Sequence, residues 1–372
     1  MTGLNLRIAV ASVPPIIEEL QRELGLSATG ASFLTAAPVL CFGLLAPLAP
    51  VLARRFGGEH VILLALLAIL TGVLARAAGP SFALFAGTVL AGAGIAVGNV
   101  IVPSVVKGRF RHTGAITGVY VATLTAGAAL AAGLTVPIER RLGWEGALAV
   151  WAIPAAVAVI VVAAAVLGHT GSSTARGGEG ASRRLLGDLI AWHVTLYMGL
   201  QSLVFYAGLA WLPSILRDAG YGATSAGTLL ALYALGGAPA AFLIPVLAGR
   251  TPDQRLLAVA VTALEAIAIL GLLLVPGAAV VWVLAFALGQ GGAIGLAVMF
   301  MVLRAPNSRS AAELSAMAQA IGYSLAAVGP LLLGALHDWT DDWEIPLTAL
   351  LLLTFPLALA GVAAGRARTV RA

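Results

Sequence analysis

Apolar runs of about twenty residues follow one another along almost the whole chain. A helix needs roughly 20 apolar residues to cross a bilayer, because each residue adds about 1.5 Å and the hydrocarbon is about 30 Å thick. Charged residues make up only 10% of the 372 residues, against about 25% in soluble proteins. The sequence therefore predicts an all-α integral membrane protein and excludes an ordinary soluble enzyme.

Twelve such runs are separated by polar breaks, and the first is the weakest because it is short and contains Asn5 and Arg7. A secretory signal peptide is the alternative interpretation of this first run. It is disfavoured, since no basic segment precedes the apolar residues and the acidic sequence EELQRE follows them. The predicted transmembrane helices have the approximate limits 1–20, 31–52, 60–78, 82–106, 114–137, 145–167, 190–213, 225–248, 256–275, 279–303, 311–336 and 345–365.

The Lys and Arg residues of the loops fall on alternate sides of the predicted membrane. Fifteen lie on one side and five on the other, and the cytoplasmic side carries the excess. We therefore expect both termini and the central loop to be cytoplasmic, and we attribute the net charge of +5 to topology and not to nucleic-acid binding. The cytoplasmic set is Arg54, Arg55, Lys107, Arg109, Arg111, Arg176, Arg183, Arg184, Arg250, Arg255, Arg304, Arg309, Arg366, Arg368 and Arg371, and the outer set is Arg22, Arg76, Arg140, Arg141 and Arg217.

The sequence contains no motif for binding a metal or a cofactor. Cys41 is the only cysteine, so an intrachain disulfide and a cysteine metal cage are excluded. His60, His112, His169 and His337 fall in loops or at helix ends, and no zinc-protease or hydrolase motif accompanies them. We predict no cofactor and no metal, which leaves a membrane-embedded enzyme as a disfavoured alternative.

A long polar stretch, GHTGSSTARGGEGASRR, separates the sixth and seventh runs. Its Gly, Ser and Arg content is typical of a flexible linker. The predicted organisation is an N-terminal half of six helices at residues 1–167, a cytoplasmic linker at 168–189, and a C-terminal half of six helices at 190–372.

The two halves contain related segments. One spacing of 197 residues relates four pairs of positions, and a spacing of 195 relates another four. An even number of helices separates the copies, so the halves share one topology and are related by an axis along the membrane normal. The pairs are Gly92 and Gly289, Gly94 and Gly291, Gly98 and Gly295, Lys107 and Arg304, Gly25 and Gly220, Ala28 and Ala223, Thr29 and Thr224, and Ala36 and Ala231.

Four segments carry a family resemblance: NLRIAVASVPPIIEELQRELGLS, GAGIAVGNVIVPSVVKGRF, GLQSLVFYAGLAWLPSIL and LSAMAQAIGYSLAAVGPLLLGALHDWT. Together they resemble the cyanate and 2-nitroimidazole transporter family of the major facilitator superfamily, from residue 4 to about 345. The resemblance implies a major facilitator fold of twelve helices, alternating access in a bacterial cytoplasmic membrane, and a small polar or anionic solute. Ile8 departs from the family, which tends to have Pro there.

Arg7 is the main candidate for binding an anion. A charged residue at mid-bilayer is costly and needs a partner, water or a function. Arg7 lies ten residues before Ile17, about 15 Å of helix, and a guanidinium binds a planar anion through two hydrogen bonds. The alternative is that Arg7 flanks a short first helix at the cytoplasmic surface; the resemblance favours the binding role.

Neutral polar residues within the predicted helices form a second group of candidates. In the superfamily that this chain resembles, helices one, four, seven and ten line the cavity, so their polar side chains are candidate substrate contacts. For each of them, interhelical hydrogen bonding is the alternative. Gln319 and Tyr323 lie four residues apart on one helix face. The complete set of candidates is Asn5, Asn99, Tyr120, Gln201, Tyr206, Gln290, Gln319 and Tyr323.

Gating and coupling candidates are Lys107, Arg304, His193 and Glu265. Lys107 and Arg304 are expected at the cytoplasmic mouth, with snorkelling to the membrane surface as the favoured alternative. His193 titrates near neutrality but lies near a helix end. Glu265 is the only acid in the middle of a predicted helix, where it is either a proton relay or a protonated packing residue.

The sequence thus predicts a secondary transporter and not an enzyme. Its expected partners are a small-molecule substrate, the lipid bilayer and, as an open question, protons; nucleic acid is excluded, and a monomer is expected. A drug or metabolite efflux pump is the alternative within transporters. A receptor or assembly factor would not need the duplicated helices or the polar residues within the membrane.

Overall fold

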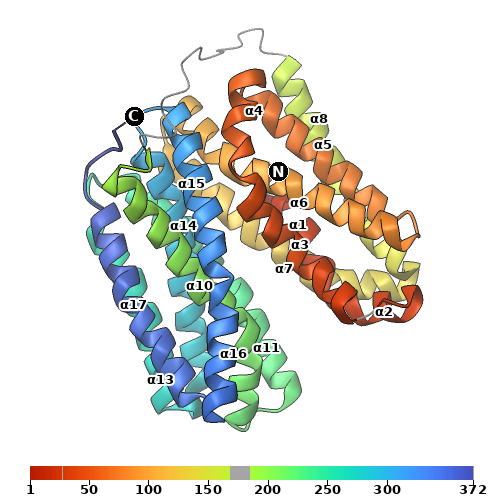
Figure 1. The fold of residues 1–372 in the computed structure, drawn as a ribbon, viewed down its shortest axis with the longest axis vertical. Coiled ribbons are helices and arrows are strands. Elements are labelled where there is room, and N and C mark those ends of the chain that lie inside the picture. The colour runs from red at the N-terminus through yellow and green to blue at the C-terminus, as the bar shows by residue number, and fades with distance from the viewer. Residues whose placement is uncertain (27, 168–184, 372) are drawn as a thin grey trace. The chain divides into compact units, whose positions relative to one another are not determined.

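The computed structural model describes residues 1–26, 28–167 and 185–371, and all regular secondary structure in these ranges is helical (Figure 1). The N-terminal helices are α1 (Thr2–Ala11), η1 (Pro14–Ile16), α2 (Ile17–Leu24), α3 (Ala28–Leu45), α4 (Leu48–Phe56), α5 (Gly58–Arg76), α6 (Ser81–Arg109), α7 (Thr113–Ala149) and α8 (Ala152–Leu167). The C-terminal helices are α10 (Leu189–Asp218), α11 (Ala223–Gly236), α12 (Ala238–Ala248), α13 (Arg255–Leu274), η2 (Pro276–Ala278), α14 (Ala279–Leu303), α15 (Ser308–Ala326), α16 (Val328–Thr340) and α17 (Glu344–Ala364).

The helices confirm the prediction of an all-α membrane fold. Within the described ranges, nine helical segments are long and apolar enough to cross a bilayer, and a tenth is formed if the bent pair α3 and α4 is one span. One of the nine, Thr113–Leu167, has 55 residues, enough for the predicted fifth and sixth helices, and it turns at Gly143 (φ 70°). The predicted first helix is broken into α1, η1 and α2, which accounts for the remaining span.

The chain divides into two compact units. The first unit comprises Met1–Val105 and Thr123–Glu179, and the second comprises Val106–Ala122 and Gly180–Ala372. The boundary therefore differs from the predicted halves by the segment 106–122, which packs with the second unit. The predicted linker at 168–189 lies mostly outside the described residues, because these resume at 185.

Two consecutive prolines break the first helix of the first unit. Pro14 and Pro15 have no N–H, so the last carbonyl groups of α1 lose their helical donors. The side chain of Arg76, the last residue of α5, donates to the carbonyl oxygen of Ala9 at this break. Arg76 is 1% exposed, so a buried cation lies at the carbonyl end of α1, where the helix dipole is negative.

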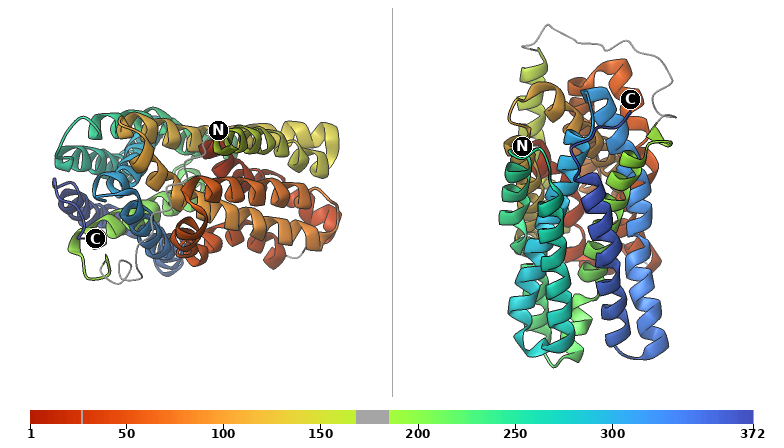
Figure 2. Two further views of the ribbon diagram at one scale, coloured as in Figure 1. Left: turned by 90° about the horizontal axis from the view of Figure 1, so that it is seen from above. Right: turned by 90° about the vertical axis from the view of Figure 1, so that its left-hand side faces the viewer.

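Close helix contacts through glycine organise the second unit. α13 packs against α14 and α17, and α10 packs against α15; α13 (teal) and α17 (dark blue) run side by side in the right view of Figure 2. A Cβ atom on Gly199 of α10 would lie 3.1 Å from Cα of Gly322 on α15. Glycine at both positions therefore lets these two helices approach closely, as expected for packing within a membrane.

The glycines also correct the repeat register in the fourth and tenth helices. Gly92 lies against Pro38 of α3, whereas Gly289 lies against Glu265 of α13, so the pair assigned by the 197-residue spacing does not contact corresponding helices. Gly94 instead lies against α5, the third span, as Gly289 lies against the ninth. Gly94 and Gly289 are 195 residues apart, the spacing of the other repeated segment.

Candidate functional site

Four predicted contacts lie on the helices α10 and α15, which pack against each other. The rings of Tyr206 and Tyr323 are 6.5 Å apart at 62°. Gln201 is 1% exposed and donates to the hydroxyl of Ser202 (2.7 Å) and the carbonyl of Met198 (3.1 Å). Gln319 is 4% exposed. This pair of helices therefore carries two amides and two phenol rings within the second unit, and the two rings are neighbours.

Gln319 is held in place by its own helix. Its amide nitrogen donates to the Oγ of Ser315 at 2.9 Å, one turn earlier on α15. Ser315 is completely buried. Because this bond uses only one amide hydrogen of Gln319, the other remains to donate to a further acceptor.

Gln290 differs from these residues because its amide is buried without a partner. The side chain is 3% exposed, and neither Nε2 nor Oε1 has a hydrogen-bond partner in the described part of the chain. Gln290 lies one turn from Phe286, whose ring packs against Tyr233 at 4.9 Å, on a helix that contacts α10. A native protein rarely leaves both ends of a buried amide unbonded, so this position calls for water or a ligand.

Asn5 serves as a link between α1 and α8. Its Nδ2 donates to the carbonyl oxygens of Met1 (3.2 Å) and Pro154 (3.0 Å), and the residue is 1% exposed. These bonds favour the interhelical alternative over substrate binding. Arg7 on the same helix is half-buried, and Asn99 on α6 and Tyr120 on α7 are buried.

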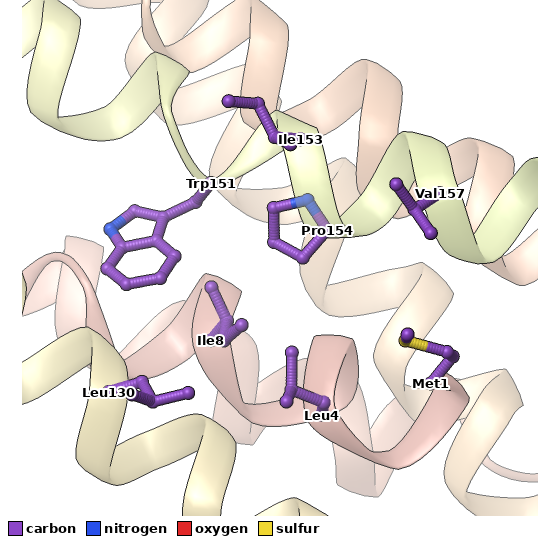
Figure 3. Close-up of a pocket in the computed structure, with 8 residues that line it drawn as sticks. All are labelled: Met1, Leu4, Ile8, Leu130, Trp151, Ile153, Pro154 and Val157. Atoms are coloured by element: carbon purple, nitrogen blue, oxygen red, sulfur yellow. The ribbon is translucent and has the colours of Figure 1, made fainter.

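A cavity of about 320 Å³ opens beside Asn5 in the first unit. In Figure 3, Leu4 and Ile8 of α1 face Trp151 and Pro154 across it. The lining side chains are apolar apart from the indole nitrogen of Trp151, which already donates to Thr135 at 3.0 Å. The cavity is therefore not the predicted polar site. Its lining residues are Met1, Leu4, Ile8, Leu130, Trp151, Ile153, Pro154 and Val157.

Arg304 is buried, which corrects the snorkelling interpretation. It is 3% exposed, and its guanidinium donates to the side-chain oxygen of Gln254 and to the carbonyl of Gly365 (3.2 Å). Its own carbonyl accepts from the backbone N–H of Val370 (2.8 Å). Burial lowers the pKa of Arg304 to about 10 and the charge of Asp253 opposes this shift, so the guanidinium stays charged at neutral pH.

Lys107 and His193 lie nearer the surface of the second unit. Lys107 is half-buried and lies close enough to Arg304 for the two positive charges to repel each other. His193 is half-buried in the second turn of α10. It interacts electrostatically with the positive charge of Arg366 and the negative charge of Asp188. Lys107 and Arg304 thus place two positive charges in one region, which suits the attraction of an anion.

Glu265 is completely buried in the middle of α13. Neither carboxyl oxygen has a hydrogen-bond partner among the residues with assigned positions. Its place in α13 agrees with the prediction that Glu265 lies in the middle of a helix.

Arg76 is a buried charged residue that sequence reasoning missed. Its position at the end of an apolar run predicts an outer loop, yet Arg76 is 1% exposed. Its Nε and Nη2 have no partner within the described ranges. No sequence pattern distinguishes it from the exposed Arg217, which also ends an apolar run. No group of three or more metal-ligating side chains exists among the residues described.

Known proteins resemble this chain over almost its whole length. The family model for the Major Facilitator Superfamily matches residues 2–330. The 2-nitroimidazole transporter of Escherichia coli K12 is 36% identical, covering 100% of this chain and 95% of the relative. The cyanate transport protein CynX of the same organism is 31% identical, covering 92% of this chain and 91% of the relative.

A solved structure shares the fold. The proton:xylose symporter XylE superimposes with a TM-score of 0.75 at 14% identity, covering 99% of this chain and 95% of that chain. The relatives are transporters of small solutes and do not favour the drug-efflux alternative. With apolar helical segments long enough to cross a bilayer, a matching family model and relatives that align from end to end, this chain belongs to the Major Facilitator Superfamily of membrane transporters.

Proposed function

We propose that this transporter carries a small polar or anionic solute, such as cyanate or a nitroimidazole, by alternating access. Two relatives are named for these two solutes. In this proposal the protein lies in the cytoplasmic membrane of a bacterium with both termini and the central loop in the cytoplasm, as the excess of basic residues indicates.

The unbonded amide of Gln290 is the observation that carries the proposal. An amide both donates and accepts, so it can bind the nitro group of a nitroimidazole or either end of cyanate. Further neutral groups are supplied by Gln201 and Tyr206 on α10 and by Gln319 and Tyr323 on α15. α14 contacts both of these helices. A site of this composition recognises a small solute through hydrogen bonds, and these five side chains carry no negative charge that would repel an anion.

Arg7 is the proposed charged contact in the first unit. It is half-buried on α1, and its planar guanidinium matches the two oxygens of a nitro or carboxylate group better than a lysine would. The positive charges of Lys107 and Arg304 serve in this proposal to attract an anion to the cytoplasmic end.

Uptake into proteoliposomes containing the full chain tests the proposal. Radiolabelled cyanate, 2-nitroimidazole and benzoate are compared for the wild type, Gln290→Ala and the control Thr228→Ala, whose exposed hydroxyl bonds within its own helix. We expect Gln290→Ala to raise the KM of the transported solute roughly 2- to 12-fold, since a neutral hydrogen bond contributes about 0.5–1.5 kcal/mol. The control should behave as the wild type.

Arg7 is tested in the same assay with Arg7→Ala and Arg7→Lys. Loss of a charged hydrogen bond costs about 1.5–3 kcal/mol, or roughly 12- to 150-fold in affinity. Lysine keeps the charge and should recover part of the loss for an anion. An unchanged KM in Gln290→Ala contradicts the site, and anion affinity that survives Arg7→Ala contradicts the role of Arg7.

A further inference from the structure

Glu265 is a carboxyl group with no partner in the interior of the second unit. The side chain is 0% exposed, and neither oxygen is hydrogen-bonded to any residue of known position. Glu265 lies ten residues after Arg255, the first residue of α13, and therefore about 15 Å into the helix. The side chain is accommodated by Gly289 of α14, where a Cβ atom would lie only 2.6 Å from the Cγ of Glu265.

Packing alone does not require a carboxyl group at this position. The corresponding contact in the first unit is made by Gly94, where a Cβ atom would lie 2.5 Å from the carbonyl oxygen of Ala65 and 3.0 Å from the side chain of Ile69. Gly289 likewise faces the carbonyl oxygen of Val261 and the residue four positions later, Glu265. Ile69 is 1% exposed, so an apolar side chain fills the equivalent place.

Among the residues that the structure describes, the helices packed against α13 bring no cation to Glu265 that would stabilise a carboxylate. α14 and α17 pack against α13, and neither has a titratable side chain between its first and last residue except Glu344 at the exposed start of α17. α12 and η2 have none. Two titratable groups interact electrostatically with Glu265: the phenols of Tyr197 on α10 and of Tyr233 on α11.

Neither phenol carries a positive charge, so neither can neutralise a carboxylate at Glu265. The hydroxyl of Tyr197 is buried and has no partner of its own within the residues located by the structure, whereas that of Tyr233 donates to the carbonyl of Phe205 at 3.2 Å. An ionised carboxylate in such a place is far more costly than a neutral one. The Glu265 carboxyl therefore holds its proton in this conformation.

We propose that Glu265 is a proton-binding site that couples solute transport to proton movement. When alternating access brings water to the carboxyl, its O–H bond breaks, the proton passes to water and a carboxylate remains; before the group is buried again, it takes a proton from water. Burial then favours the protonated form, so proton binding and conformation are thermodynamically linked. The proposal rests on the proposed transport function.

Transport by proteoliposomes tests the coupling. The solute is the one that the wild type transports among cyanate, 2-nitroimidazole and benzoate, and the variants are Glu265→Gln and Glu265→Ile. The isoleucine variant reproduces the contact of Ile69, which keeps the helices packed if glutamine disturbs them. We expect both variants to lose accumulation driven by a pH gradient while retaining exchange of labelled for unlabelled solute. Glu344→Gln, an exposed acid, should retain both.

Infrared spectroscopy of the full chain in lipid tests proton binding without any solute. The wild type should show the carbonyl stretch of a buried protonated carboxylic acid, and Glu265→Gln should lack it. If no probe is transported but this band is present and lost in the variant, the proposed function fails and the proton site stands. A band that is absent or unaltered by the substitution, or gradient-driven accumulation that persists in Glu265→Ile, overturns the proposal.

Discussion

Buried amide side chains differ in this protein in whether they are hydrogen-bonded. Asn5 donates to two backbone carbonyls on two helices, whereas both ends of Gln290 are unbonded in the part of the chain with described coordinates. Removing a satisfied amide weakens the fold, while removing an unsatisfied one affects what the site binds. The roles of Asn5 and Gln290 can therefore be distinguished by measuring the stability of each variant together with its affinity for the transported solute.

We expect Asn5→Ala to lower the free energy of unfolding by about 1 kcal/mol, because interhelical hydrogen bonds within membranes contribute about 0.6 kcal/mol each and at most about 1.7. The KM for the transported solute should not change. Denaturation of the purified protein in detergent, followed by tryptophan fluorescence, measures the first quantity, and liposome uptake measures the second. A raised KM with unaltered stability would show that Asn5 binds solute instead.

At the scale of helices, glycine has two roles that the sequence does not separate. A Cβ atom on Gly291 of α14 would clash with the carbonyl oxygen of Gly237, where α11 meets α12, whereas nothing lies within 4 Å of one on Gly227 of α11. The first glycine permits a close backbone approach. The second only reduces the helix propensity of α11.

The substitutions Gly291→Ala and Gly227→Ala should therefore have opposite effects. Overpacking at Gly291 should lower the free energy of unfolding by about 1–3 kcal/mol. Alanine at Gly227 should raise it by up to about 1 kcal/mol, because alanine has the higher helix propensity. Melting temperatures in one detergent compare the two variants directly. Equal effects of the two substitutions would contradict the close approach of α14 to Gly237.

At the scale of the molecule, the distribution of basic residues determines the expected orientation. Arg22 and Arg217 belong to the outer set and Arg368 to the cytoplasmic set, and all three side chains are exposed. Cys41, the only cysteine, is 7% exposed and buried. Cysteines introduced at exposed positions can therefore be labelled against a low background.

We expect a membrane-impermeant maleimide to label Arg22→Cys and Arg217→Cys in intact cells carrying Cys41→Ala. Arg368→Cys should be labelled only after the cells are permeabilised, because the C-terminal segment is cytoplasmic in the proposed topology. Gel shift with a maleimide-linked polymer reports the extent of labelling. Labelling of Arg368→Cys in intact cells would reverse the orientation.

Hydropathy and repeats predicted the fold well because they depend on many residues at once. The limits of α13 and α14 differ by at most one residue from the predicted 256–275 and 279–303, because each helix spans the hydrocarbon as one uninterrupted apolar run. Individual side chains were predicted less well. Arg76 and Arg304 both end apolar runs, and only tertiary contacts with Ala9, Gln254 and Gly365 decide that they are buried.

The contact between Arg76 and the broken first helix has a consequence for how the protein is made. α5 enters the bilayer after α1, and the Arg76 guanidinium costs several kcal/mol when a helix carries it into lipid alone. The carbonyl end of α1 lowers that cost, since Ala9 accepts the bond and the two helices are in contact. The third span is therefore inserted at lower cost when the first span is already beside it, so α1 contributes to the insertion of α5 as well as to the final fold.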